Sequence, residues 1–177
     1  MSSLAVTHGQ RRRIVAGSLA LLVAIVAAVV ALGGGDVSAE GDTVPTASFE
    51  LFDGGTASFA DYEGRPLVIN FWASWCPACV AELPDVQAVH EARGDEVTFL
   101  GLANADRRGA AMALAEDVGL TYTLGDDPDG DLFRALELIA MPSTIFVTAD
   151  GRIQDVFGGQ LDERALVARI DRLLETP

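Results

Sequence analysis

The chain has 177 residues, half of them hydrophobic, and a formal net charge of −14. This length allows one domain with an additional segment. Residues 33–177 contain all 26 acidic residues and nine of the 12 arginines, which gives this part a net charge of −17. A domain this acidic repels phosphate backbones, so the composition argues against nucleic acid as a partner.

The first segment is Ile14–Leu32, a run of 19 residues without a charged side chain. As a helix it rises about 28 Å at about 1.5 Å per residue, close to the thickness of the hydrocarbon core of a bilayer. Arg11–Arg13 precede it directly, and the positive-inside rule keeps such residues in the cytoplasm. We therefore expect a cytoplasmic N-terminus over residues 1–13 and a single transmembrane anchor over residues 14–32. The following domain then lies on the extracytoplasmic side of the cytoplasmic membrane.

A cleaved signal peptide is the alternative, since Val37-Ser38-Ala39 fits a small-residue cleavage site and would release a secreted form. The apolar core of such peptides is shorter, about 7–15 residues, which favours the uncleaved anchor. Residues 33–44 are rich in Gly, Asp, Ser and Thr and are expected to form a tether. The exported domain is thus predicted over residues 45–177.

Strands are predicted from short apolar runs between turn residues. Leu67–Trp72 is mostly apolar, as is typical of a central strand covered on both faces. Asp150-Gly151 favours a hairpin turn between the last two strands, and Asp126–Gly130 is expected to be a loop. The other predicted strands are Phe49–Phe52, Val97–Leu102, Tyr122–Leu124, Thr144–Thr148 and Ile153–Phe157.

Helices are predicted between these strands. Pro77–Arg93 begins with a proline, which suits a first helical turn, and Gly94 ends it. Pro84 inside this helix is expected to kink it. The other predicted helices are Gly109–Val118, Asp131–Leu138 and Leu161–Leu174. Strands that alternate with helices in this way indicate an α/β domain.

The chain contains two cysteines, Cys76 and Cys79, which lie too close together to join distant parts of a fold. A structural zinc site requires four ligands, and the only histidines are His8 and His90, so a redox pair is the better interpretation. Cys76 stands where a strand gives way to a helix, and the free amides and dipole of that helix favour a thiolate. We therefore expect Cys76 to be the nucleophile. Cys79, one turn further, is expected to expel a bound partner from the mixed disulfide.

The segment Asn70–Glu82 closely resembles the active site of the membrane-anchored, extracytoplasmic thioredoxin-like proteins of the ResA/TlpA and cytochrome c maturation (DsbE-like) family. The likeness covers about residues 44–174 and includes Gly64-Arg65-Pro66, Met141-Pro142-Ser143-Thr144, and Asp150-Gly151 with Ile153. It implies a thioredoxin fold, in which a mixed central sheet carries helices on both faces. It also implies that Pro142 is cis and lies opposite the cysteines. The backbone of Met141 is then placed to pair with an extended partner.

Supporting roles follow from the same comparison. Asn70 stands where cytoplasmic thioredoxins carry a buried Asp, so it cannot accept a proton from Cys79. Glu82 matches a Glu of the ResA-type group and is the candidate base, with an ordinary solvated helix residue as the alternative. Trp75 is expected to border the site because it adjoins Cys76. We expect Trp72 to lie in the core and His90 on the helix surface.

The predicted function is thiol–disulfide exchange with exported proteins, without a bound cofactor. No Lys, Arg or His lies within ten residues of Cys76, which favours a reductant of disulfides. The resemblance implies exported substrates such as apocytochromes c. A membrane thiol–disulfide electron carrier is the expected redox partner. A disulfide-donating oxidase is the main alternative. A peroxiredoxin-like peroxidase is less favoured, because residue 73 is Ala where that family has Thr. A copper chaperone is also less favoured. Its cysteines would be separated by three residues rather than two and followed by a distant His, and this chain has neither feature.

Overall fold

The computed structural model describes residues 41–175 of the chain. The predicted anchor at residues 14–32, the cytoplasmic residues before it and most of the tether lie outside this range. Within the described range, none of the helices combines the length and apolar character needed to cross a membrane. The anchor thus stays a prediction.

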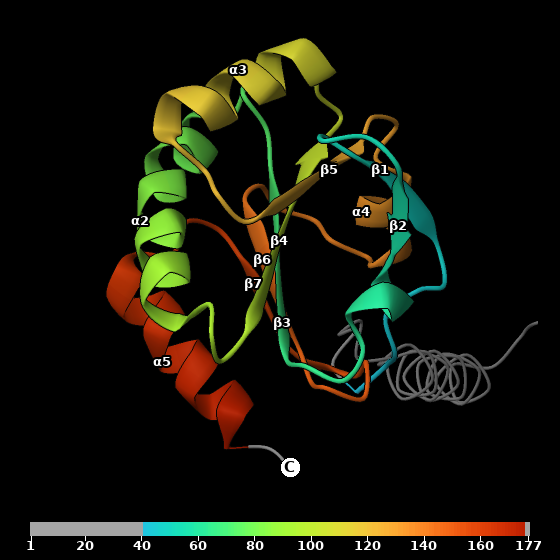
Figure 1. Ribbon diagram of the computed structural model, residues 1–177, viewed down its shortest axis with the longest axis vertical. Coiled ribbons are helices and arrows are strands. Elements are labelled where there is room, and N and C mark those ends of the chain that lie inside the picture. Colours follow the sequence, from blue (N-terminus) through green and yellow to red (C-terminus); the bar gives the residue numbers. More distant parts are fainter. Residues whose placement is uncertain (1–40, 176–177) are drawn as a thin grey trace, which may run out of the picture. The chain divides into compact units, whose positions relative to one another are not determined.

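The described residues form one seven-stranded mixed sheet with the strand order β2-β1-β5-β4-β3-β6-β7 (Figure 1). The central strand β3 pairs in parallel with β4 and antiparallel with β6. The predicted mixed sheet is therefore confirmed. The strands are β1 (Ser48–Leu51), β2 (Thr56–Ser58), β3 (Leu67–Trp72), β4 (Thr98–Asn104), β5 (Thr123–Asp127), β6 (Ser143–Val147) and β7 (Ile153–Gly158).

Helices cover both faces of this sheet, as the resemblance implied. The core on one face includes side chains of α2, α3 and α5, and the core on the other includes those of α4 and the 3-10 helix η1. Helix α2 continues through Pro84 and ends at Gly94. The helices are η1 (Phe59–Tyr62), α2 (Pro77–Arg93), α3 (Arg108–Val118), α4 (Asp131–Ala135) and α5 (Glu163–Leu174).

Strand β3 is buried along its whole length, as predicted for a central strand. Its odd-numbered residues, such as Ile69, pack in the core beneath α4, whereas Val68 and Trp72 pack on the side of α2. Because strand side chains alternate between faces, Asn70 lies on the side of α2 as well. A polar residue is thus placed in an otherwise apolar layer next to the helix that carries the cysteines.

The prediction of a loop at residues 126–130 was wrong at its start, because Asp126 and Asp127 belong to β5. Both acids are buried, which only partnered carboxylates tolerate. Asp126 pairs with Arg108, and Asp127 accepts hydrogen bonds from the first backbone amides of α4. These partners, rather than strand propensity, hold the acids in the sheet. Strand β2 and η1 were not predicted.

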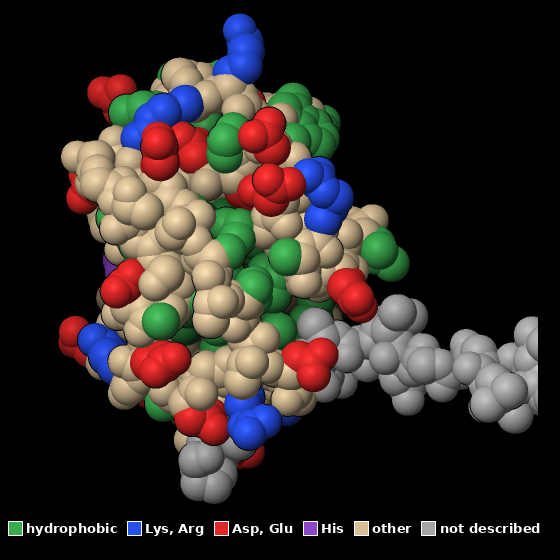
Figure 2. All heavy atoms as spheres, turned by 90° about the vertical axis from the view of Figure 1, so that its right-hand side faces the viewer, with side chains coloured by type: hydrophobic (Ala, Val, Ile, Leu, Met, Phe, Trp, Pro, Cys, Tyr) green, Lys and Arg blue, Asp and Glu red, His purple; other side chains and the backbone are tan. Residues whose placement is uncertain are grey.

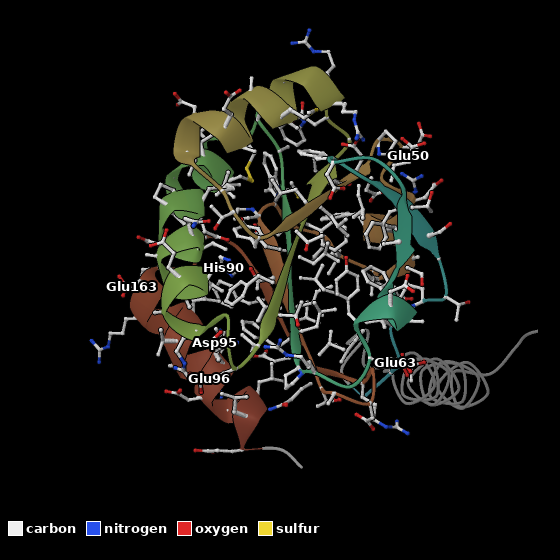
Figure 3. All side chains as sticks on the ribbon, viewed as in Figure 1. Glu50, Glu63, His90, Asp95, Glu96 and Glu163 are labelled. Carbon is white, nitrogen blue, oxygen red and sulfur yellow. A yellow bond between two sulfur atoms is a disulfide. The ribbon has the colours of Figure 1, made fainter. Side chains whose placement is uncertain are left out.

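The expectation that His90 lies on the helix surface holds only in part, because the residue is half-buried. Its ring packs edge-on against Phe99 and Tyr122, with centroid distances of 5.3 and 5.4 Å, on the side of α2 that faces the sheet (Figure 3). Partial burial lowers the pKa of His90, although the nearby Glu91 acts in the opposite direction.

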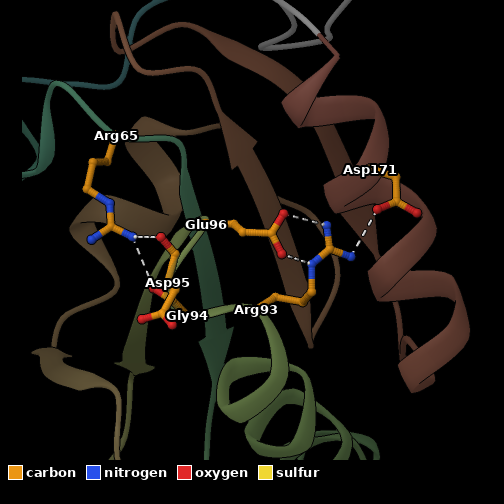
Figure 4. Close-up of polar contacts among 6 residues, drawn as sticks. All are labelled: Arg65, Arg93, Gly94, Asp95, Glu96 and Asp171. Carbon is orange, nitrogen blue, oxygen red and sulfur yellow. Dashed lines mark hydrogen bonds and ion pairs between the residues drawn. The ribbon is translucent and has the colours of Figure 1, made fainter.

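The C-terminal end of α2 is fixed by charged groups far from the cysteines (Figure 4). Arg93 contacts Glu96 at 2.5 Å and Asp171 of α5 at 2.9 Å. Arg65, in the lead-in to β3, donates to the carbonyl groups of Gly94 and its neighbour. These contacts join α2, α5 and the start of β3.

The face of the domain toward the β1–β2 hairpin carries more acidic than basic side chains (Figure 2), in keeping with the net negative charge of the domain.

Candidate active site

The cysteine pair lies where β3 gives way to α2. Cys76 is the N-cap of the helix, with extended backbone angles of −99° and 106°, and Pro77 is the first helical residue. The sulfur of Cys76 accepts a hydrogen bond from the amide of Cys79 at 3.2 Å. The two cysteines form a disulfide with a Cα–Cα distance of 5.2 Å, visible at the start of α2 (Figure 3). A thiolate at Cys76 would thus face a helix N-terminus.

The two sulfurs differ in their access to solvent. Cys79 is 0% exposed and packs among Trp72, Leu83 and the small side chains of α3, whereas Cys76 is 5% exposed. A partner can therefore reach Cys76 more readily than Cys79. This difference supports the assignment of Cys76 as the nucleophile.

The turn before Cys76 is held by the loop that follows β4. Asp106 accepts hydrogen bonds from the amide and the hydroxyl of Ser74, and the carbonyl of Ala105 accepts one from the indole of Trp75 at 3.1 Å. Ala105 has a φ of 47°, in the left-handed region that favours glycine, so the backbone of this loop is strained at the residue that contacts Trp75. Trp75 remains 56% exposed and borders the site, as expected.

The cis-proline loop forms the other side of the site. The Met141–Pro142 peptide bond is cis, and Met141 packs against the cluster that contains both cysteines. The sulfur of Met141 accepts a hydrogen bond from the side-chain nitrogen Nδ2 of Asn104 at 3.7 Å. The backbone N–H and carbonyl of Met141 make no hydrogen bond within residues 41–175. This backbone is therefore free to pair with an incoming chain.

Glu82 is buried, being only 1% exposed, so the interpretation as a solvated helix residue was wrong. Its Oε1 accepts a hydrogen bond from Asn70 at 2.8 Å, and its Oε2 accepts one from the amide of Leu161 at 2.8 Å. Burial raises the pKa of Glu82 to about 7, although both hydrogen bonds act in the opposite direction and Asp85 adds to the rise. A carboxyl with this pKa can accept or release a proton near neutral pH.

The arginine of the closing hairpin, Arg152, does not approach the cysteines. Strand β6 runs away from the active-site end of β3, as the pairing of Phe71 with Ser143 and of Leu67 with Val147 shows. The hairpin after β6 therefore lies at the opposite end of the sheet. There, Arg152 contacts Asp150 at 3.3 Å.

The sequence did not indicate Asn104, Asp106 or Leu161 as parts of the site, and it indicated Thr144 only as the last residue of the cis-proline motif. A signal existed for Asp106, because it follows a strand next to β3 and the carboxyl ends of parallel strands meet at the same edge of a sheet. Leu161 contributes only its backbone amide, which no sequence pattern reveals.

Comparison with known proteins agrees with this geometry. Residues 39–174 match the Redoxin family. Thiol-disulfide oxidoreductase ResA of Oceanobacillus iheyensis is 27% identical over 164 residues, which cover 86% of this chain and 84% of ResA. Thiol:disulfide interchange protein DsbE of Pseudomonas fluorescens is 34% identical over 109 residues, or 61% of this chain and 60% of DsbE.

Among solved structures, a secreted Mycobacterium tuberculosis disulfide oxidoreductase homologous to E. coli DsbE superimposes with a TM-score of 0.67 and 27% identity. The superposition covers 72% of this chain and 96% of that structure. The match to the Redoxin family spans most of the chain and contains both cysteines and the cis-proline loop. The chain therefore belongs to the Redoxin family and is a thiol–disulfide oxidoreductase of the ResA and DsbE type.

Proposed function

We propose that this protein is an extracytoplasmic reductant that transfers two electrons from the Cys76–Cys79 dithiol to disulfides of exported proteins, with apocytochromes c as candidate substrates. The observation that carries the direction of transfer is the charge around the cysteines. Asp106 binds the turn before Cys76, and Glu82, one helical turn after Cys79, adds negative charge in its ionised form. Anionic groups disfavour a thiolate, and a destabilised thiolate makes the disulfide a weaker oxidant.

The cations of the described residues do not offset these acids by direct contact. Arg108 pairs with Asp126, and none of the ion pairs within residues 41–175 includes an acid that contacts the cysteine turn. Arg107 follows Asp106 directly but is exposed, where solvent and salt screen its charge. The helix dipole therefore acts on Cys76 with little support from cations.

The proposed reaction has two exchange steps. The thiolate of Cys76 attacks one sulfur of the partner disulfide, forms a mixed disulfide and releases the other partner sulfur as a thiolate, which takes a proton from solvent. The sulfur of Cys79 then attacks Cys76 and releases the second partner sulfur in the same way. The partner gains two electrons and two protons, and the enzyme is left with the Cys76–Cys79 disulfide.

Glu82 is the proposed acceptor of the proton that Cys79 loses before its attack. The burial of both residues and the pKa of Glu82 near 7 support this role, since water cannot easily reach Cys79. Asn70, in contrast, has no basic group. The proton returns to solvent when the site opens or the enzyme is reduced again.

Partner binding is proposed at the rim between Trp75 and Met141. The exposed indole offers apolar area, and the free backbone groups of Met141 can form strand-like hydrogen bonds with an extended segment. These contacts place a partner sulfur near Cys76. They require no particular partner sequence, so the substrate class rests on location. We propose that residues 14–32 anchor the domain outside the cytoplasmic membrane, where a membrane thiol–disulfide electron carrier reduces it again.

The deciding experiment is equilibration of the full chain with glutathione redox buffers, followed by quantification of the dithiol and disulfide forms. A reductant of disulfides should show a potential well below the about −120 mV of strong periplasmic oxidants. A potential near that value would make this protein a disulfide donor instead. A peroxide-consumption assay tests the peroxidase alternative, and Cu(I) titration of the reduced protein tests the copper chaperone.

A further inference from the structure

A small polar network lies buried between β3 and α2, the helix that carries Cys79. Asn70 of β3 donates from its side-chain nitrogen Nδ2 to Glu82 Oε1 at 2.8 Å and to the hydroxyl of Thr144 in β6 at 3.2 Å. The amide of Leu161 donates to Glu82 Oε2 at 2.8 Å. All four residues are at most 2% exposed. Each carboxylate oxygen thus has its own donor from a different part of the chain.

This arrangement suits an ionised Glu82, but a protonated carboxyl carries an O–H that needs an acceptor. A proton on Oε2 would face the backbone N–H of Leu161, which can only donate. A proton on Oε1 would face the Asn70 side chain, which has an acceptor oxygen, Oδ1, as well as a nitrogen donor. Within residues 41–175, Asn70 Oδ1 is buried and makes no hydrogen bond. Only Oε1 therefore has a partner that can change from donor to acceptor.

We propose that Asn70 is a positioning residue that reverses its side-chain amide when Glu82 gains or loses a proton. Nδ2 donates to the carboxylate, and after rotation Oδ1 accepts the proton carried by Oε1. The hydroxyl of Thr144 both donates and accepts, so its contact with Asn70 survives the rotation. This inference rests on the proposed role of Glu82 as the proton acceptor for Cys79.

The reversal gives Glu82 a hydrogen-bond partner in both protonation states, in a site with little access to water. An aspartate at position 70 could not do this without placing a second carboxylate against the first. The other titratable groups that act on Glu82 are Asp85 on α2 and the buried phenol of Tyr122, which precedes β5. Neither makes a hydrogen bond to it, so Asn70 is the side chain whose orientation can follow the proton.

The direct test is an NMR titration, because the chain contains only two asparagines, Asn70 and Asn104. The full chain, oxidised and in detergent micelles, is labelled with 13C,15N-asparagine and titrated between pH 5 and 9. The side-chain 15N and 13Cγ signals of Asn70 should shift together with a midpoint near the Glu82 pKa of about 7. Asn104 contacts Met141 rather than Glu82, so its signals should stay constant.

Glu82→Gln supplies the control, because it removes the titrating group and should abolish the shift at Asn70. The proposal is overturned if Asn70 signals stay constant while labelled Glu82 titrates, or if they shift equally in Glu82→Gln. An unchanged pH–rate profile in Glu82→Gln would instead remove Glu82 from the reaction and leave the NMR result intact. Failure of the inference and failure of the proposed base are therefore distinguishable.

A kinetic cycle tests whether the reversal matters for exchange. Asn70→Leu keeps a similar volume and should slow resolution of a mixed disulfide on the order of tenfold, a part of the usual contribution of a general base. The same change in a Glu82→Gln background should have little further effect, because the two residues act as a unit. Equal slowing by Asn70→Leu in both backgrounds would show a general structural role and overturn the proposal.

Discussion

Asp106 accepts a hydrogen bond from the backbone amide of Ser74 at 2.5 Å and a second one from the Ser74 hydroxyl at 3.0 Å. The two residues follow β4 and β3, which are parallel neighbours, so the contact joins two loops at one edge of the sheet. It holds the turn that leads into Cys76. It also fixes a carboxylate against Ser74, two residues before the cysteine whose sulfur carries negative charge in the reaction.

The first prediction follows from that charge. Asp106→Asn keeps an oxygen that can accept from Ser74 but removes the negative charge, so the thiolate of the reduced form becomes more stable. We expect the reduction potential to rise by on the order of 30 mV, which corresponds to about 1.4 kcal/mol for a two-electron couple. Equilibration with glutathione buffers measures this change.

The matched control for this experiment is Asp95→Asn, which removes the same charge at the opposite end of α2 (Figure 3). Its potential should stay within a few millivolts of the wild type because screening weakens charges at this distance. Equal shifts in the two variants would show that net charge, and not the position of Asp106, sets the potential.

The second prediction concerns the two cysteines. Cys76→Ser should abolish exchange, whereas Cys79→Ser should still attack a disulfide and retain the partner as a mixed disulfide. The difference in burial supports this asymmetry. Non-reducing gels and mass spectrometry of the Cys79→Ser protein after incubation with a disulfide substrate reveal the trapped species. Faster alkylation of Cys79 than of Cys76 in the reduced wild type would reverse the assignment.

The third prediction concerns the N-terminal segment. The full chain should sediment with membranes and resist extraction by carbonate, because residues 14–32 supply 19 uncharged residues, enough to span a bilayer. A variant with Leu21 and Val26 both changed to Arg should be recovered in the soluble fraction. Recovery of a soluble wild-type protein that begins near Glu40 would instead support cleavage after Ala39.

The active-site helix could be predicted because local sequence determines it. An apolar run that suits a buried strand leads to Cys76, and Pro77 suits the first helical turn, so β3 and α2 have the bounds that the pattern predicts. The cis-proline loop was anticipated only through resemblance to a family. Its position against the cysteines depends on pairing between β3 and β6, which lie about seventy residues apart.

The parts that could not be predicted depend on partners distant in sequence. Asp126 and Asp127 were predicted to be loop residues, because nothing nearby in the sequence reveals Arg108 or the amides of α4 as their partners. Glu82 has the appearance of a solvated helix residue until Leu161, 79 residues later, is placed against it. The family resemblance suggested a base, but its burial and its polar partners required the structure.

The fourth prediction separates the roles of the two tryptophans. Trp75 is exposed at the rim, so Trp75→Ala should lower kcat/KM for a protein substrate about 5- to 30-fold, as expected for an aromatic contact worth about 1–2 kcal/mol. Its melting temperature should change little. Trp72 is fully buried, and Trp72→Phe should mainly lower the melting temperature. Loss of stability in Trp75→Ala that matches its loss of activity would contradict a role in binding.

The last prediction is the effect of Glu82 on the pH dependence of stability. The pKa of Glu82 is about 7 in the folded protein, against an ordinary value of 4.5. Between these two pH values the folded state holds a proton that the unfolded state has released, so stability falls as pH rises. The contribution is fully present below about pH 4.5 and is lost by the time the pH has passed about 7. Its full size is on the order of 3 kcal/mol, at about 1.4 kcal/mol for each unit of pKa difference.

This effect is measured on the oxidised protein, in which neither cysteine titrates. Urea unfolding at several values between pH 4.5 and 8 gives the free energy of unfolding of the wild type and of Glu82→Gln. Other carboxyl groups titrate alike in both proteins, so the difference between the two curves isolates Glu82. Gln cannot release a proton, and we expect the variant to gain stability relative to the wild type as pH rises. Parallel curves across this range would mean that the pKa of Glu82 is the same in the folded and unfolded states. The carboxyl would then be ionised at neutral pH and could not hold the proton of Cys79.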